Sequence, residues 1–342
     1  MNHPIRIMQS IVAAAVLLSA NALYAAADSP LAAAQAPADE SLVQQIFETM
    51  VKAGAKPGYR LAHAKGIVTQ GTFTPSKGAA SLSKAAHFQG APVPVIVRFS
   101  NGPADPSTPD NSPDAGPRGM AIRFNLPGGG RTDLVVLSHN GFVVGNGEDF
   151  LALEKAAVAT DPSQPHPWPI EAFLGAHPLA LKFVQESQAV PVSFATAEFF
   201  SNDAFIFVNQ QAVRRAGRYQ IIPLAGQHTL SNAEAKAKSA NFLFEELRTR
   251  LKTGPVKFRL VAQLANPGDP TNDASLVWPD DRKTVELGTI SITSVVADSD
   301  AAQKALVFFP TTLTDGIELS DDPLPALRTA AYALSFARRQ RP

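Results

Sequence analysis

The feature that most constrains the fold is a succession of short segments that alternate apolar and polar residues and are bounded by Gly and Pro, a pattern typical of β-strands. They lie at residues 66–75, 92–101, 119–130, 132–140, 202–210, 217–226, 256–265 and 287–296. Turns rather than regular crossover helices separate most of them, which favours an antiparallel sheet over a doubly wound one. We therefore predict an α+β fold with an antiparallel β-barrel core and surrounding helices.

Helical periodicity appears outside these segments. The predicted helices cover residues 41–53 (with Ser41 as N-cap), 147–159, 170–189, 232–252 and the C-terminal stretch 328–339. No Ser/Gly/Pro-rich linker divides residues 41–342, which indicates one domain.

Charge and cysteine content exclude several classes of function. The chain has 342 residues, 30 basic and 30 acidic side chains and no cysteine. A neutral chain offers no electrostatic field for gathering nucleic acid, so we expect no nucleic-acid partner. Without cysteine there is no disulfide, thiolate metal site, iron–sulfur cluster or cysteine nucleophile. The absence of an HExxH motif argues against a zinc hydrolase.

The N-terminus indicates export. Arg6 precedes an apolar run from Ile11 to Leu23, and the small residues Ala25 and Ala27 suit signal-peptidase cleavage. We predict a signal peptide at residues 1–27 and a disordered segment at 28–40, rich in Ala, Pro, Asp and Ser. The mature protein is then periplasmic, without stable membrane association. An uncleaved anchor is the alternative, although the apolar run is short for a spanning helix.

The C-terminal helix carries a chemically specific face. Arg328, Tyr332 and Arg339 fall within roughly 40° of one another at about 100° per residue. A tyrosine can ligate iron as a phenolate when a fixed cation stabilises it, and Arg328 is placed to do so. The alternative is an ordinary amphipathic helix with a stacked arginine and tyrosine.

Two further segments carry polar residues of interest. In RLAHAKG, Arg60 and His63 lie where a loop turns into the first predicted strand. In VIVRFS, Arg98 and Ser100 alternate onto one strand face. A buried arginine needs an anion, and haem propionates would supply one.

Together these segments resemble the haem catalase family. Its pieces RxxHAKG, VRFS, PRGxAx(R/K)F, DLV, GIE and RxxxYxxxxxxR stand here in the family's order, as residues 60–66, 97–100, 117–124, 133–135, 316–318 and 328–339. The resemblance covers the chain from about residue 55 to its end. It is greatest to the short catalase-related peroxidases.

The resemblance implies a haem b cofactor and a role for each matching residue. His63 matches the distal histidine, and Ser100 the serine that hydrogen-bonds it. Tyr332 matches the axial iron ligand, and Arg328 the arginine that keeps it ionised. The residues that match propionate partners are Arg60, Arg98 and Arg339.

Three positions depart from the family pattern. An ungapped alignment puts Ser138 at the position of the distal asparagine, whereas a two-residue shift brings Asn140 there. Phe336 replaces a histidine of many catalases, and Ala62 replaces a bulky valine before the distal histidine. A small Ala62 implies a roomier distal pocket.

The implied activity is a peroxidase that reduces hydrogen peroxide and organic hydroperoxides through a ferryl intermediate, with weak catalase activity. Its partners are the peroxide and a small-molecule electron donor. Whether the chain forms a homo-oligomer is not decided by the sequence. One alternative is a hydroperoxide isomerase of the allene oxide synthase type, although Ala62 lacks the hydroxyl found before the distal histidine of those enzymes. Another is a periplasmic haem carrier that uses a barrel cavity.

Overall fold

The structure is a computed structural model that describes residues 38–341. Its strands lie close to the segments that the alternating pattern predicts, and β1 has the predicted bounds. The strands are β1 (Gly66–Pro75), β2 (Val93–Ser100), β3 (Gly119–Asn125), β4 (Arg131–Leu137), β5 (Phe199–Phe200), β6 (Phe205–Val208), β7 (Arg214–Pro223), β8 (Val256–Leu264), β9 (Thr284–Val295) and β10 (Ile317–Leu319).

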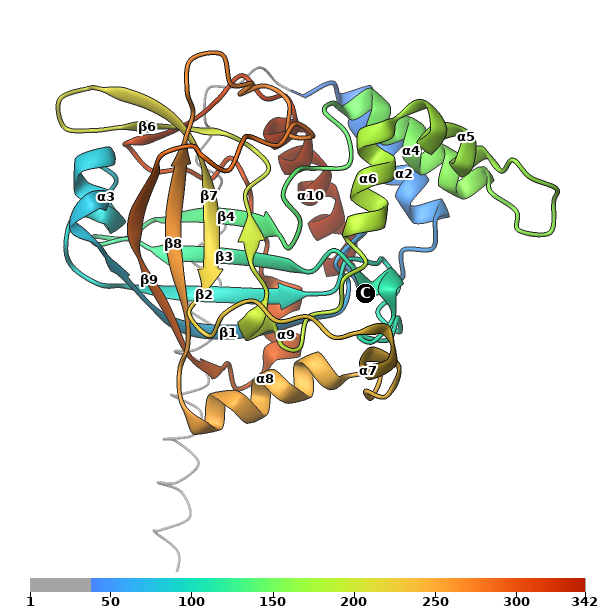
Figure 1. Cartoon of the computed structure of the whole chain (residues 1–342), viewed down its shortest axis with the longest axis horizontal. Helices are drawn as coiled ribbons and strands as arrows, with labels where there is room; N and C mark the ends of the chain where they lie inside the picture. The colour runs from blue at the N-terminus through green and yellow to red at the C-terminus, as the bar shows by residue number, and fades with distance from the viewer. Residues whose placement is uncertain (1–37, 342) are drawn as a thin grey trace, which may run out of the picture.

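These strands form one antiparallel sheet that closes on itself (Figure 1). Eight strands make the barrel, in the order β7–β5–β4–β3–β2–β1–β9–β8, with β8 paired back to β7. The short strands β6 and β10 extend the sheet beyond β7. The predicted α+β fold with an antiparallel barrel core is confirmed.

The barrel interior is filled with apolar side chains. Along β2, Val93, Val95, Val97 and Phe99 are buried in the main core cluster, as a period of two requires for one face. The Phe99 ring lies 6.1 Å from the Phe258 ring of β8. Because β2 and β8 are not neighbours in the sheet, this contact crosses the interior. The side chains between them on β2, including Arg98, therefore face outward.

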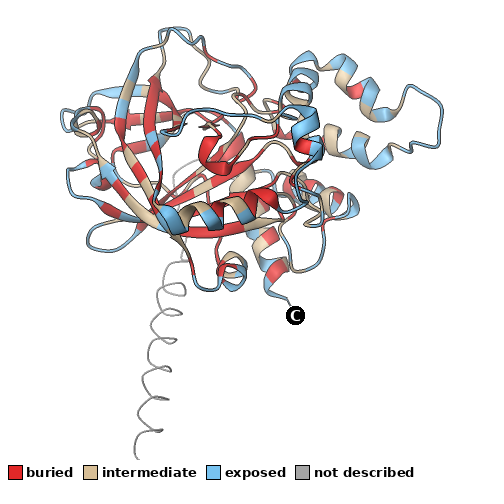
Figure 2. Cartoon of the chain, turned by 60° about the horizontal axis from the view of Figure 1, so that its bottom comes forward, coloured by how far each residue is buried: buried red, intermediate tan, exposed pale blue. Residues whose placement is uncertain are grey.

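The helices lie outside the barrel. They are α2 (Glu40–Lys52), α3 (Lys77–Leu82), α4 (Gly147–Ala159), α5 (Pro169–Ala176), α6 (Pro178–Glu186), α7 (Asn232–Lys236), α8 (Phe242–Thr253), α9 (Ser299–Ala305) and α10 (Leu324–Gln340). Figure 1 shows α10 beside the barrel wall and α2, α4, α5 and α6 grouped on one side. In Figure 2 the barrel strands are largely buried, whereas the α5 side of this group is largely exposed.

Two predicted helices are each divided in two. The predicted helix 170–189 breaks into α5 and α6 at Pro178, because proline lacks an N–H and disfavours helical geometry at the residue before it. The predicted helix 232–252 breaks into α7 and α8. There the buried Asp110 binds the chain, accepting from the backbone N–H of Leu243 and donating its own N–H to the Ala240 carbonyl.

The N-terminal prediction is only partly covered by the structure. Asp39, rather than the predicted Ser41, caps α2 by accepting from the backbone N–H groups of Ser41 and Leu42. The predicted signal peptide at 1–27 and most of the predicted disordered segment lie outside the described residues. Within residues 38–341, no helix combines the length and apolar character needed to cross a membrane.

Candidate active site

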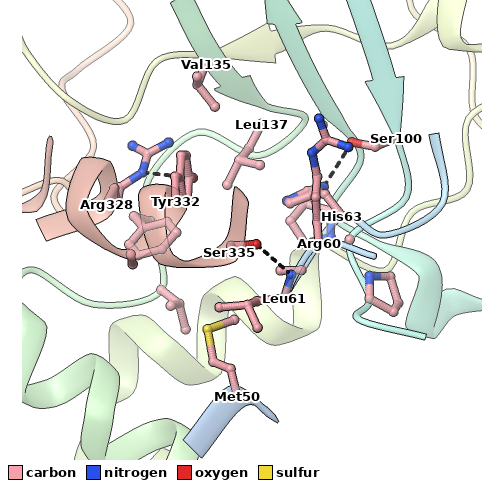
Figure 3. Close-up of a pocket in the computed structure, with 18 of the residues that line it drawn as sticks. Met50, Arg60, Leu61, His63, Ser100, Val135, Leu137, Arg328, Tyr332 and Ser335 are labelled. Atoms are coloured by element: carbon pink, nitrogen blue, oxygen red, sulfur yellow. Dashed lines mark hydrogen bonds between the residues drawn. The ribbon is translucent and has the colours of Figure 1, made fainter. Parts of the chain in front are cut away.

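A pocket of about 480 Å³ lies between the outward faces of β2–β4 and helix α10, and α2, α4 and α6 complete its walls (Figure 3). It brings together nearly all of the predicted site residues from segments far apart in the sequence. Those that line it are Arg60, His63, Arg98, Ser100, Arg328, Tyr332 and Arg339. In Figure 3, Tyr332 and Arg328 lie across the pocket from His63 and Ser100.

Helix α10 supplies one side of the pocket. Its buried positions Leu327, Ala331 and Ser335 recur every four residues and form one face of the helix. Arg328 and Tyr332 lie next to this face, and both line the cavity. Arg328 Nε donates a hydrogen bond of 3.3 Å to Tyr332 Oη. The predicted pairing of guanidinium and phenol on one helix face is therefore present.

Asp203, which was not among the predicted site residues, forms an ion pair with Arg328. Arg328 Nη1 and Asp203 Oδ2 are 2.6 Å apart, and Asp203 is only 1% exposed. Burial alone would lower the pKa of Arg328, but the Asp203 charge and the Tyr332 contact raise it above its usual value. Arg328 is therefore a fixed cation beside the phenol. Asp203 precedes β6 by two residues, and no local pattern marks it.

On the opposite side, His63 sits in the loop before β1 with a left-handed φ of 54°. Its backbone N–H donates to the Gly102 carbonyl at 2.7 Å. The buried Asp110 carboxylate joins the His63 loop to the segment that follows β2. It accepts hydrogen bonds from Lys65 Nζ (2.6 Å) in the loop and from Asn101 Nδ2 (2.8 Å) after the strand. This network gives a structural reason for the lysine of the HAKG segment.

The imidazole of His63 is held against the barrel wall. His63 Nδ1 and Ser100 Oγ share a hydrogen bond of 3.1 Å, as the resemblance implies. Gly119 on β3 leaves the space for both, since a Cβ there would lie 2.7 Å from His63 Nδ1. This explains the glycine of the PRG segment, whose spatial role no local sequence pattern indicates.

The charge state of His63 follows from its surroundings. Burial, then the charges of Arg98 and Arg328, lower the pKa of His63 to about 3. The imidazole is therefore neutral at neutral pH. Its Nε2 has no hydrogen-bond partner among residues 38–341 and remains available to a ligand in the pocket.

Three arginines, Arg60, Arg98 and Arg339, gather at the end of the pocket near α9. Each donates only to neutral oxygens: both Arg60 and Arg339 to the Leu306 carbonyl, and Arg98 to the His63 carbonyl. No carboxylate among residues 38–341 forms an ion pair with any of them.

This arginine cluster is electrostatically uncompensated. Burial and then the neighbouring Arg339 lower the pKa of Arg98 to about 9, and burial lowers that of Arg339 to about 10. The Nε atoms of Arg98 and Arg339 are buried without a partner. Unpaired buried cations are costly, so the cluster fits an anionic ligand better than it fits an empty cavity.

Asn140 does not reach the pocket. Strand β4 ends at Leu137, which lines the cavity, and the lining resumes only at Phe142 and Val143. Ser138 lies outside the lining as well, since its Oγ accepts from the Arg118 backbone N–H at 2.8 Å. Of Leu137, Ser138 and Asn140, only Leu137 lines the pocket (Figure 3), and a distal role for Asn140 stays a prediction.

Apart from Asp114 and Glu154, the rest of the pocket is largely apolar. Ile46 and Met50 come from α2, Phe150 and Leu153 from α4, and Phe183 from α6. The pocket lies on the outer face of the barrel, whereas the carrier alternative places its ligand inside it. The space between His63 and Tyr332 suits a large flat apolar group whose acidic substituents meet the arginine cluster, and the α2, α4 and α6 wall lies beside it.

Comparison with solved structures identifies the architecture. A fungal catalase solved at 1.9 Å superposes with a TM-score of 0.74 at 20% identity, covering 84% of this chain and 60% of that chain. Catalase A from Saccharomyces cerevisiae superposes with a TM-score of 0.74 at 19% identity, covering 83% and 62%. A barrel whose outer wall and C-terminal tyrosine helix enclose a pocket is thus the catalase fold, and the chain spans about three-fifths of those two chains.

Sequence comparison is more specific. A family model described as Catalase matches residues 49–341. The catalase-related peroxidase of Mycolicibacterium paratuberculosis (strain ATCC BAA-968 / K-10) is 38% identical, over 84% of this chain and 90% of its own. The catalase-related peroxidase of Synechococcus elongatus is 33% identical, over 84% and 85%. The chain belongs to the catalase family, and the resemblance to its short members is confirmed.

Proposed function

We propose that this protein is a haem-dependent peroxidase that reduces hydrogen peroxide and organic hydroperoxides at the expense of a small-molecule electron donor. The observation that carries the proposal is the pocket itself, in which a phenol–guanidinium pair faces a neutral imidazole beside three arginines without anions. Membership of the catalase family supports a peroxide-acting oxidoreductase.

The residues present fit haem b. Arg60, Arg98 and Arg339 would hold the two propionates, which supply the negative charge that the arginine cluster lacks. Tyr332 would ligate the iron, with Arg328 stabilising its negative charge. Bound haem supplies the redox chemistry that no side chain of this cysteine-free protein provides.

His63 is the proposed acid–base residue. Its neutral Nε2 accepts the proton from one peroxide oxygen and returns it to the other, so that the O–O bond breaks and water or an alcohol leaves. Ser100 orients the ring through Nδ1, and Gly119 keeps it against the wall. Two electrons and two protons from the donor complete the reduction of ROOH to ROH and water.

The lining of the pocket favours peroxidase over strong catalase activity. Ala62 is small, and neither Ser138 nor Asn140 presents a polar group to a second peroxide molecule beside His63. Oxidation of an organic donor is then the better supported outcome. Ala62 also lacks the hydroxyl that would favour a hydroperoxide isomerase.

The test measures two products from one holoprotein preparation. Hydrogen peroxide and an organic hydroperoxide are added in turn, with oxygen release and oxidation of a chromogenic donor followed together. We expect donor oxidation to dominate with both peroxides. Vigorous oxygen evolution with negligible donor oxidation would overturn the peroxidase assignment, and no turnover of either kind would favour a carrier.

Variants assign the acid–base role. His63→Gln should retain haem but lose about 10²- to 10⁴-fold in peroxide reduction, the usual range for general acid–base catalysis. The exposed His228→Gln variant is the matched control. An unchanged rate in His63→Gln would remove His63 from this role.

We also propose that the protein is exported to the periplasm after cleavage near Ala27. The apolar run between Ile11 and Leu23 and the small residues after it support this. Amino-terminal sequencing of the protein from a periplasmic fraction tests it. A mature protein that retains Met1 would contradict it.

A further inference from the structure

Two ionisable groups line the pocket without belonging to the proposed haem site, Glu154 and the exposed Asp114. Glu154 projects from α4 into the apolar section formed by α2, α4 and α6. It forms no hydrogen bond or ion pair with any other residue from 38 to 341. Burial raises the pKa of Glu154, and no neighbouring charge offsets this. Glu154 is half-buried, and a carboxyl group without a partner in a largely apolar wall favours a ligand that donates a hydrogen bond to it.

The surroundings of Glu154 indicate what it can bind. Phe142, Phe150 and Phe183 line the same section, with the Phe142 ring 6.0 Å from that of Phe150 and 6.3 Å from that of Phe183. Aromatic walls favour a flat aromatic ring, because stacked and edge-to-face contacts add to the burial of apolar area. An N–H group on such a ring could donate to the Glu154 carboxylate.

The charges in the pocket are also separated. Its cations, Arg60, Arg98, Arg328 and Arg339, come from the loop before β1, from β2 and from α10, whereas α4 contributes the Glu154 carboxyl group and no cation to the lining. In the proposed holoprotein the propionates and Asp203 engage these arginines, and Asp114 accepts from Ser112 Oγ, which leaves Glu154 as the lining carboxyl group without a partner among residues 38–341. An anionic donor would then meet like charge without a counter-ion.

We propose that Glu154 is a specificity-determining residue that binds the amino group of an aromatic amine electron donor and disfavours anionic donors. This inference rests on the proposed peroxidase function and names the donor class for the same site. The ring of the donor lies among Phe142, Phe150 and Phe183, and its N–H groups donate to the carboxylate.

The experiment compares wild-type holoprotein with Glu154→Gln, which keeps the shape of the side chain and removes its charge. The donors are an aromatic diamine and a sulfonated aromatic compound, each at saturating peroxide. We expect Glu154→Gln to raise KM for the diamine by about tenfold, as for the loss of a hydrogen bond to a charged group, with kcat little changed. KM for the sulfonate should fall. The exposed Glu148→Gln variant on the same helix is the matched control and should leave both values unchanged.

A binding measurement separates this inference from the proposed function. Calorimetric titration of the diamine into holoprotein without peroxide should show the same tenfold loss of affinity in Glu154→Gln. The ratio of the KM values of wild-type protein for the two donors should also approach one as the salt concentration is raised, because salt screens the Glu154 charge. This measurement does not depend on the folding of a variant. Equal effects on both donors, or none, with haem and peroxide reduction intact would overturn the role of Glu154 alone. A wild-type protein without peroxidase activity would instead overturn the proposed function.

Discussion

Gly119 offers a sharp test of how the barrel positions the imidazole. It faces Ser100 across the β2–β3 pairing and lies directly against His63. In Gly119→Ala the added Cβ would lie 2.6 Å from Ser100 Oγ and 2.7 Å from His63 Nδ1. Because Ser100 is fixed on a central strand, the imidazole is the group that must move.

The size of the displacement follows from these distances. Ordinary van der Waals contact begins at 3.4 Å, so the His63 ring must shift by roughly 0.7 Å or rotate away. A misplacement of about 1 Å at a catalytic group can cost about 10²-fold in rate. We therefore expect Gly119→Ala to lower kcat for peroxide reduction by about 10²-fold and to destabilise the fold by about 1–3 kcal/mol through overpacking.

The assay normalises the rate of peroxide reduction to haem content, so that loss of folded protein is not counted as loss of catalysis. Gly175→Ala on α5 is the matched control, since its added Cβ would meet no atom within 4 Å. We expect this control to keep wild-type activity. If Gly119→Ala retains full activity per haem, the claim that the wall of β3 positions His63 is wrong.

Three further predictions follow from buried contacts. In Gly66→Ala the new Cβ would overlap the Arg98 guanidinium, so haem titration should show affinity reduced by about tenfold or more; equal affinity would contradict a role for Arg98 in haem binding. Asp203→Asn removes the buried partner of Arg328 and should lower the free energy of unfolding by about 3 kcal/mol in urea titrations, whereas a loss below about 0.5 kcal/mol would refute the importance of the pair. Burial lowers the pKa of His87 from 6.5 to about 3. Between pH 6.5 and about pH 3, therefore, His87 binds a proton in the unfolded chain but not in the folded protein. Stability contributed by neutral His87 is therefore lost on acidification below pH 6.5, at about 1.4 kcal/mol per pH unit, and His87→Phe should flatten that dependence.

The parts of the fold that followed from sequence are those fixed by local periodicity. Strand β1 and helix α4 have their predicted bounds because Gly, Pro and an asparagine cap delimit them. The divisions at residues 177 and 237–241 depend on Pro178 and on the distant Asp110. Because the helical pattern of apolar residues continues across both breaks, it predicts one helix where the structure has two.

The site divides in the same way. The shared face of Arg328, Tyr332 and Arg339 is a property of one helix, so the sequence could predict it. Asp203 pairs with Arg328 over 125 positions, and nothing near either residue indicates the contact. Asn140 does not line the pocket, because β4 ends at Leu137 and that end, which an alignment shift does not take into account, decides which side chains face the cavity.

The central claim is that Tyr332 holds haem iron in this pocket, and an absorption spectrum during haem titration tests it most directly. The account predicts that the wild-type protein binds haem stoichiometrically with the bands of a tyrosinate-ligated ferric centre, and that Tyr332→Phe loses those bands. A wild-type protein that stays colourless with haem in excess, or a Tyr332→Phe variant with an unchanged spectrum, would contradict it.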